Sequence, residues 1–171
     1  SIDGLLGIVH SLSENKISDN MANPETATVA TAPFASADIR HELTQLKQLV
    51  KEFQSVKEKL ELEEIPTYDR GAIGYYLHNF YNGCESIFQS VASFFENDIE
   101  AESWHRDLLR RVTLEINGYR PRLVDEHLYQ LLDDFRGFRH KFRHSYGFEL
   151  DWDKLRLVAR KLEKTATVFH I

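Results

Sequence analysis

The segment from Tyr68 to Glu96 places the strongest constraint on how this chain can fold, because its apolar residues recur on almost every side of a helix. Within residues 71–95 the only formal charge belongs to Glu85. Asn79, Asn82, Gln89 and several serines interrupt the run, which favours a buried helix over a membrane span. A helix that is apolar on nearly all sides must be covered all round, so we expect it at the centre of the fold. The apolar positions are Ile73, Tyr76, Leu77, Phe80, Tyr81, Cys84, Ile87, Phe88, Val91, Phe94 and Phe95.

Helical periodicity also governs the rest of the chain after Ser36. Ser36 is a candidate N-cap for a first helix whose apolar residues, from Ile39 to Leu60, recur at three- and four-residue steps until Pro66 ends the region. Three more helices are predicted, over about 102–116, over about 122–144, and from Asp151 or Asp153 to the end. No alternation typical of strands competes with this pattern. The prediction is an all-α fold, an antiparallel bundle of about five helices.

The N-terminal residues have a different composition. Residues 20–37 are rich in Ala and Thr and contain Pro24 and Pro33, a pattern typical of an extended or disordered linker. We therefore expect an irregular N-terminal extension over 1–36 and one helical domain over 37–171. Met21 is a candidate natural start, in which case residues 1–20 are a processed leader or come from expression.

Charge is distributed unevenly along the chain. The net charge is −6, but residues 1–103 hold 7 basic and 17 acidic residues, net −10, whereas residues 104–171 hold 14 and 10, net +4. The basic part can therefore bind a polyanion, which the acidic part would repel. The single cysteine, Cys84, allows no internal disulfide and is interpreted as a buried thiol rather than a nucleophile. Ile2 to Val9 lacks the basic lead of a secretory signal, so we expect the cytoplasm.

The most reactive stretch lies late in the fourth predicted helix. Within nine residues it carries four permanent cations and two histidines and no carboxylate; they are Arg136, Arg139, His140, Lys141, Arg143 and His144. Unneutralised charge of one sign opposes folding, so the cluster suggests an anionic ligand. Histidines add groups that move protons near neutral pH. A cation beside such a group suits the cleavage of a phosphodiester, although a solvated basic helix end, favoured by the helix dipole, explains the same pattern.

The spacing sets a geometric condition on that chemistry. Arg139 and His144 are five residues apart, about 140° round an ideal helix. A helix that ends near His144, or a second copy across a symmetric interface, would bring both side chains to one phosphate. His140 and His144 are one turn apart, as metal-ligating pairs often are, but no cysteine or clustered carboxylate completes a zinc site, so we expect neither a metal nor another cofactor.

The segment Arg139-His140-Lys141-Phe142-Arg143-His144-Ser145-Tyr146 resembles the signature of the HEPN superfamily, and within it of the HepT-like ribonuclease toxins. That signature is an arginine, four residues, a histidine, one residue and a tyrosine, with a polar residue such as His140 commonly after the arginine. The resemblance implies a HEPN-like helical domain and a metal-independent endoribonuclease with Arg139 and His144 as catalytic residues and His140 as support. Arg136, Lys141 and Arg143 would contact RNA.

The same resemblance implies partners. Such toxins form homodimers that pair two copies of the motif in one cleft, or larger hetero-oligomers with a minimal nucleotidyltransferase antitoxin, which adenylylates the motif tyrosine, here Tyr146. The implied substrate is RNA, with tRNA as one candidate, and no membrane is implied. Tyr146 can also orient His144 or stack on a base. Two alternatives stay open: a non-catalytic HEPN-type binding partner of a nucleotidyltransferase, and an RNA-binding scaffold.

Overall fold

The computed structural model describes residues 7, 31–95, 108–117, 120–144, 146 and 149–171, for 31–35 and 94–95 the backbone alone. The described part is helical, and its one β-type contact is an isolated bridge between Ile116 and Arg120. The all-α prediction of about five helices is confirmed. The elements are α2 (Thr31–Phe53), the 3₁₀ helix η2 (Gln54–Glu61), α3 (Thr67–Phe95), α5 (Glu126–Phe142), α6 (Trp152–Ala159) and α7 (Leu162–Phe169).

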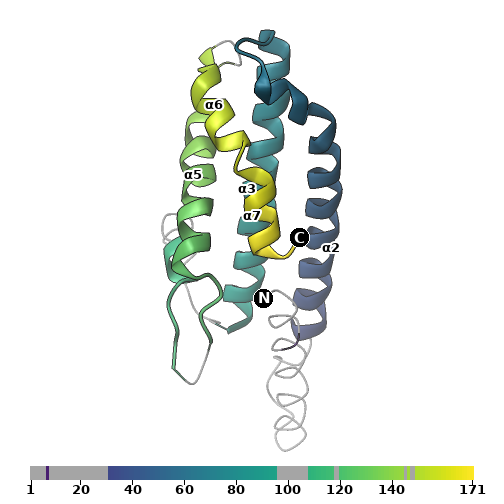
Figure 1. Cartoon of the computed structure of the whole chain (residues 1–171). Helices are drawn as coiled ribbons and strands as arrows, with labels where there is room; N and C mark the ends of the chain where they lie inside the picture. Colours follow the sequence, from purple (N-terminus) through teal and green to yellow (C-terminus); the bar gives the residue numbers. More distant parts are fainter. Residues whose placement is uncertain (1–6, 8–30, 96–107, 118–119, 145, 147–148) are drawn as a thin grey trace, which may run out of the picture.

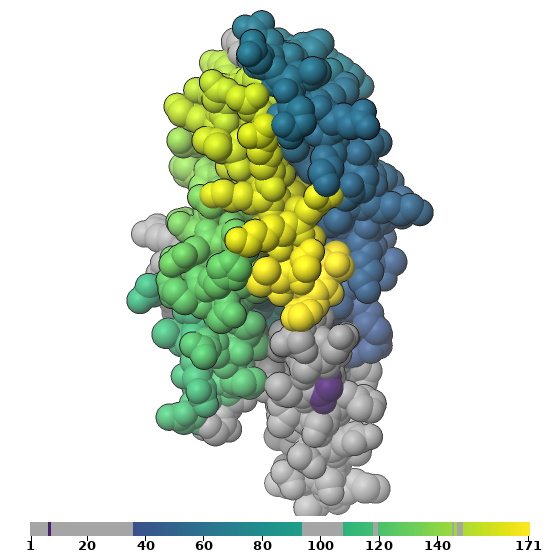
Figure 2. Space-filling view, in the orientation of Figure 1, coloured from purple at the N-terminus to yellow at the C-terminus, as the bar shows by residue number. Residues whose placement is uncertain are grey.

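Helix α3 is the central element, as its encircling apolar residues predict. It packs against α2, α5 and α6 (Figure 1), while α7 lies against α5 and α2. Its residues Ile73, Leu77, Phe80, Cys84 and Val91 have no exposed surface. Figure 2 shows α6 and α7, in yellow, covering the face between α5 and α2. None of the helices within the described ranges is long and apolar enough to span a membrane.

Two small residues let neighbouring helices approach α3 closely. A Cβ built on Gly83 would lie 2.7 Å from Leu46 Cδ2 of α2. A Cβ built on Gly74 would lie 2.6 Å from Phe142 Cε2, at the end of α5. Both distances are shorter than real carbon contacts, so these glycines set the separation between the helices.

Several predicted boundaries differ from the structure. Helix α2 already includes Thr31, so Ser36 is not an N-cap; its hydroxyl instead accepts a hydrogen bond from Arg40 one turn on. Residues 31–36, expected in the extension, are therefore helical, and the rest of that extension lies outside the described residues apart from residue 7. The division into extension and domain otherwise stays a prediction.

The third predicted helix is shorter than expected. Its described part is helical only over 108–111, and residues 102–107 lie outside the described part. The helix does not reach Ile116, because the Val112 carbonyl accepts hydrogen bonds from the backbone N–H groups of Leu123 and Val124. The buried Arg120 guanidinium donates to the Arg111 carbonyl at 3.1 Å and satisfies that helix end.

The last two predicted helices also differ at their ends. The fourth begins at Glu126, not at 122, because Asp125 caps it by accepting from Leu128 N–H at 2.8 Å. The fifth is two helices, α6 and α7, since Lys161 N–H bonds to the Val158 carbonyl three residues back and interrupts the ladder. Asp151, one of the two expected starts, is the N-cap of α6.

Candidate functional site

The apolar residues of α5 fix its rotation against the core and so determine where its basic residues lie. The apolar residues Leu128, Leu131, Leu132 and Phe135 are buried. The centroid of the Phe135 ring lies 5.1 Å from that of the Phe80 ring on α3. At 3.6 residues per turn, the cations that follow Phe135 fall on the faces adjoining this apolar side. The basic cluster is thus carried on a helix whose rotation is set by its core contacts.

The C-terminal end of α5 is anchored by Phe142. Its ring faces Gly74 and packs 5.4 Å from the His78 ring and 5.5 Å from the Phe138 ring. Beyond Phe142 the chain leaves the helix, and His144 N–H bonds to the Lys141 carbonyl three residues back at 3.0 Å. The helix therefore ends two residues before His144, which is one of the two geometries that would let Arg139 and His144 converge.

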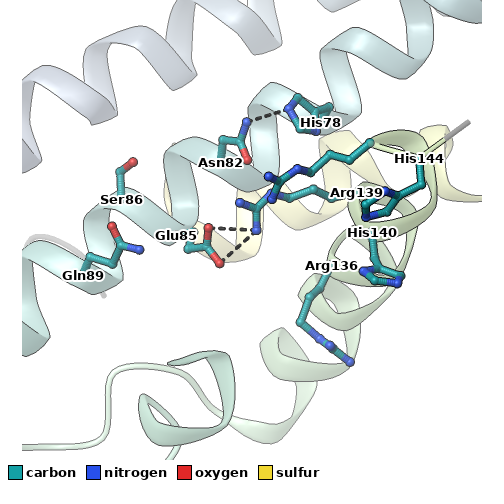
Figure 3. A pocket seen from close by; sticks show the side chains of 10 residues that line it. His78, Asn82, Glu85, Ser86, Gln89, Arg136, Arg139, His140 and His144 are labelled. Atoms are coloured by element: carbon teal, nitrogen blue, oxygen red, sulfur yellow. Dashed lines mark hydrogen bonds and ion pairs between the residues drawn. The ribbon is translucent and has the colours of Figure 1, made fainter. Parts of the chain in front are cut away.

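A pocket of about 1060 Å³ opens between α3 and α5. Arg139 and His144 both line it, so the two residues expected to be catalytic share one pocket in a single chain (Figure 3). The basic wall comes from α5 and the turn after it, and the opposite wall comes from α3. The lining residues are Arg136, Arg139, His140, Arg143 and His144 on the first wall and His78, Asn82, Glu85, Ser86 and Gln89 on the second.

Two residues expected in the site do not line this pocket. Lys141 is exposed, on another side of α5. Tyr146 follows the helix end with 71% of its surface exposed, and its backbone N–H donates to Glu149 Oε2 at 2.9 Å. Helix α5 itself ends at Phe142, slightly before the end expected at about residue 144.

Glu85 is the functional candidate that the motif does not contain. Its carboxylate oxygens lie 3.0 Å (Oε1) and 2.9 Å (Oε2) from Arg139 Nη1, across the gap between α3 and α5. The Tyr81 ring lies under the same guanidinium, 5.6 Å from Cζ. The burial of Tyr81 and the Glu85 charge raise the pKa of the Tyr81 phenol, so it stays neutral. Arg139 is therefore fixed by an ion pair and a ring contact.

The α3 wall contributes neutral hydrogen-bonding groups. His78 Nε2 and Asn82 Nδ2 are 2.9 Å apart. Burial lowers the pKa of His78, and the Arg139 and Arg143 cations lower it further, so this imidazole is neutral at pH 7. The pocket thus has a cationic wall and a nearly uncharged wall, with Glu85 the exception.

The remaining charges in and around the cluster are partly compensated. Arg136 Nε donates to Asp133 Oδ1 at 2.7 Å on its own helix, and this contact raises the pKa of Arg136. The His140 and His144 rings lie 5.3 Å apart, edge to face. Within the described ranges, no group of three or more His, Cys, Asp or Glu residues is arranged to hold a metal ion.

Comparison with known families identifies the chain's family. The model of a family described as HepT-like protein matches residues 72–171, more than half of the chain. The chain belongs to the HepT-like family. The match runs from the first half of α3 to the C-terminus and includes every residue that lines the pocket. Neither the search of curated proteins nor the search of solved structures found a match.

This assignment confirms the resemblance inferred from the motif between Arg139 and Tyr146. It places the protein in the HEPN superfamily, as a toxin-like protein. Proteins of this superfamily are typically ribonucleases.

Proposed function

We propose that this HepT-like protein is the toxin of a toxin–antitoxin pair and acts as a metal-independent endoribonuclease. The observation that carries the proposal is that Arg139 and His144 line one pocket, on the wall that also carries Arg136 and Arg143. An RNA phosphate drawn to these cations would meet a guanidinium and an imidazole together.

The chemistry follows from those two groups. An unprotonated His144 accepts the proton of a ribose 2′-OH, whose oxygen attacks the adjacent phosphorus. The bond from phosphorus to the 5′ oxygen breaks, that oxygen takes up a proton, and a 2′,3′-cyclic phosphate remains. Proton transfer of this kind contributes about 10²–10⁴-fold to the rate. The Arg139 guanidinium stabilises the charge that builds up on the phosphate oxygens, which is worth about 3 kcal/mol for one preorganised donor.

Cleavage of a model RNA in the presence of a chelator tests the proposal. Wild type should cut RNA but not DNA and leave 2′,3′-cyclic ends, whereas Arg139→Ala and His144→Ala should lose the activity. Lys154→Ala is the matched control, because it removes a cation with 76% of its side chain exposed on another helix. Equal cleavage by wild type and both pocket variants would refute these roles.

Binding without cleavage would favour the RNA scaffold instead. In that case affinity falls by roughly 0.7 log units per log unit of salt for each phosphate contact on a single strand, and no product appears. The same titration on the inactive His144→Ala variant measures the phosphate contacts of Arg136, Lys141 and Arg143, each of which should reduce the salt dependence when replaced.

The proposal includes regulation through Tyr146 and assembly into homodimers. Tyr146 is exposed and lies two residues beyond His144. AMP on its hydroxyl would place a bulky anion beside the pocket and oppose RNA by sterics and like charge. Incubation with ATP and a minimal nucleotidyltransferase antitoxin should add AMP to the peptide containing Tyr146 and not to Tyr146→Phe. An unmodified peptide with loss of toxicity would instead indicate inhibition by binding.

A further inference from the structure

Among the described residues that line the pocket, Glu85 is the only carboxylate. We propose that Glu85 is a positioning residue for RNA cleavage: it holds the Arg139 guanidinium in the orientation that receives the scissile phosphate. The proposal rests on the ribonuclease function proposed above. It concerns a residue outside the motif, 54 positions before Arg139 in the sequence.

The ion pair between Glu85 and Arg139 is short and mostly buried. Arg139 Nη1 lies within 3.0 Å of both Glu85 oxygens, and the two side chains expose only 22% and 10% of their surface. Screening by solvent is weak at such exposure, so the pair is held more firmly than a surface salt bridge. It also joins α5 to the central helix at the level of the pocket (Figure 3).

The remaining guanidinium nitrogens have distinct surroundings. Nε is buried and has no hydrogen-bond partner among the described residues, and the Tyr81 ring covers one side of the group at 5.6 Å. With Nη1 held by Glu85 and Nε enclosed, Nη2 and the second Nη1 hydrogen are the donors left for a phosphate. Because a guanidinium is planar, fixing Nη1 also fixes the direction of these donors.

The negative charge of Glu85 allows an experiment to distinguish a positioning role from simple phosphate binding. A carboxylate in a pocket lined by three arginines repels an incoming phosphate, so a pocket that only bound RNA would bind it better without this charge. Loss of the charge should therefore strengthen RNA binding and weaken catalysis, since a freely rotating Arg139 no longer meets the transition state in the right geometry. A residue that merely held α5 against α3 would change folding stability and would not produce opposite effects on these two quantities.

The experiment compares Glu85→Gln with wild type in the full chain. Glutamine keeps the size and one acceptor for Arg139 and removes the charge. Single-turnover cleavage of an oligoribonucleotide in chelator gives the rate constant, and fluorescence anisotropy gives the affinity in the non-cleaving His144→Ala background. Glu163→Gln is the matched control, because it removes the same charge from α7, where Glu163 forms a surface ion pair with Lys57 of η2. We expect Glu85→Gln to cleave about 10- to 100-fold more slowly and to bind roughly fivefold more tightly, with Glu163→Gln unchanged in both.

Three outcomes would overturn the proposal. If wild type cleaves RNA and Glu85→Gln cleaves equally fast, the positioning role is wrong and the ribonuclease function stands. If Glu85→Gln binds RNA no more tightly and loses activity only in proportion to a loss of folded protein, Glu85 is structural. If wild type does not cleave at all, both this proposal and the ribonuclease proposal fail.

Discussion

Replacing Gly74 by alanine should destabilise the fold at the end of α5 without touching any group proposed to react. The new methyl would lie 2.6 Å from Phe142 Cε2, 3.1 Å from its Cδ2 and 3.4 Å from Leu150 Cδ1. The ring cannot simply move away, because it also packs against His78 and Phe138. Overpacking of this kind costs about 1–3 kcal/mol.

Gly71, on the same helix, provides the control. A Cβ there meets nothing within 4 Å, so Gly71→Ala retains the gain in helix propensity, about 1 kcal/mol, without the clash. Because both variants share that gain, the difference between them isolates the overlap with Phe142. We expect Gly74→Ala to be about 1–3 kcal/mol less stable than Gly71→Ala. In a chain of this length that difference corresponds to roughly 2–12 °C in Tm.

Urea unfolding followed by circular dichroism measures the difference directly. Phe142→Leu should recover stability in the Gly74→Ala background while costing stability in the parent chain, as a double-mutant cycle would reveal. Because Phe142 directly precedes Arg143 and His144, Gly74→Ala should also slow RNA cleavage. Equal stability of the two glycine variants would refute the argument that Gly74 sets the approach of α5 to α3.

Three residues outside the motif, Asp125, Cys84 and His78, each give a further prediction. Asp125→Ala should lower the free energy of unfolding by about 0.5–2 kcal/mol, because Leu128 N–H loses its cap, and Asp125→Asn should lower it less. Equal losses of the two variants in urea unfolding would contradict the capping role. Burial raises the pKa of the Cys84 thiol, so Cys84 should resist a thiol reagent in the native protein and react once urea unfolds it, and rapid native labelling would disprove this. The pKa of His78 is lowered in the folded state, so the unfolded chain binds this proton more strongly and the folded state loses stability as the pH falls below 6.5. NMR should find that the His78 imidazole of the folded protein titrates below 6.5. A higher value would show that burial and the Arg139 charge do not act on it.

The sequence was sufficient for the helical class and for the central place of α3. Apolar periodicity is a local property, and a helix with apolar residues on nearly every side can only be stable when it is covered on all sides. The motif from Arg139 to Tyr146 also indicated the family, because its fixed positions are close together in the chain. Helix ends were less predictable: α5 begins at its Asp125 cap, and the last helix divides where backbone bonding changes at Lys161.

Only the tertiary structure could place Glu85 against Arg139. The sequence marks Glu85 as the single formal charge within residues 71–95 but indicates no partner for it. Its partner depends on how far and at what rotation α5 packs on α3, which the Gly74–Phe142 and Phe80–Phe135 contacts determine. Periodicity fixes which side of each helix faces inward, but the pairing of one residue with another across two helices depends on packing between them, and no local pattern encodes that register.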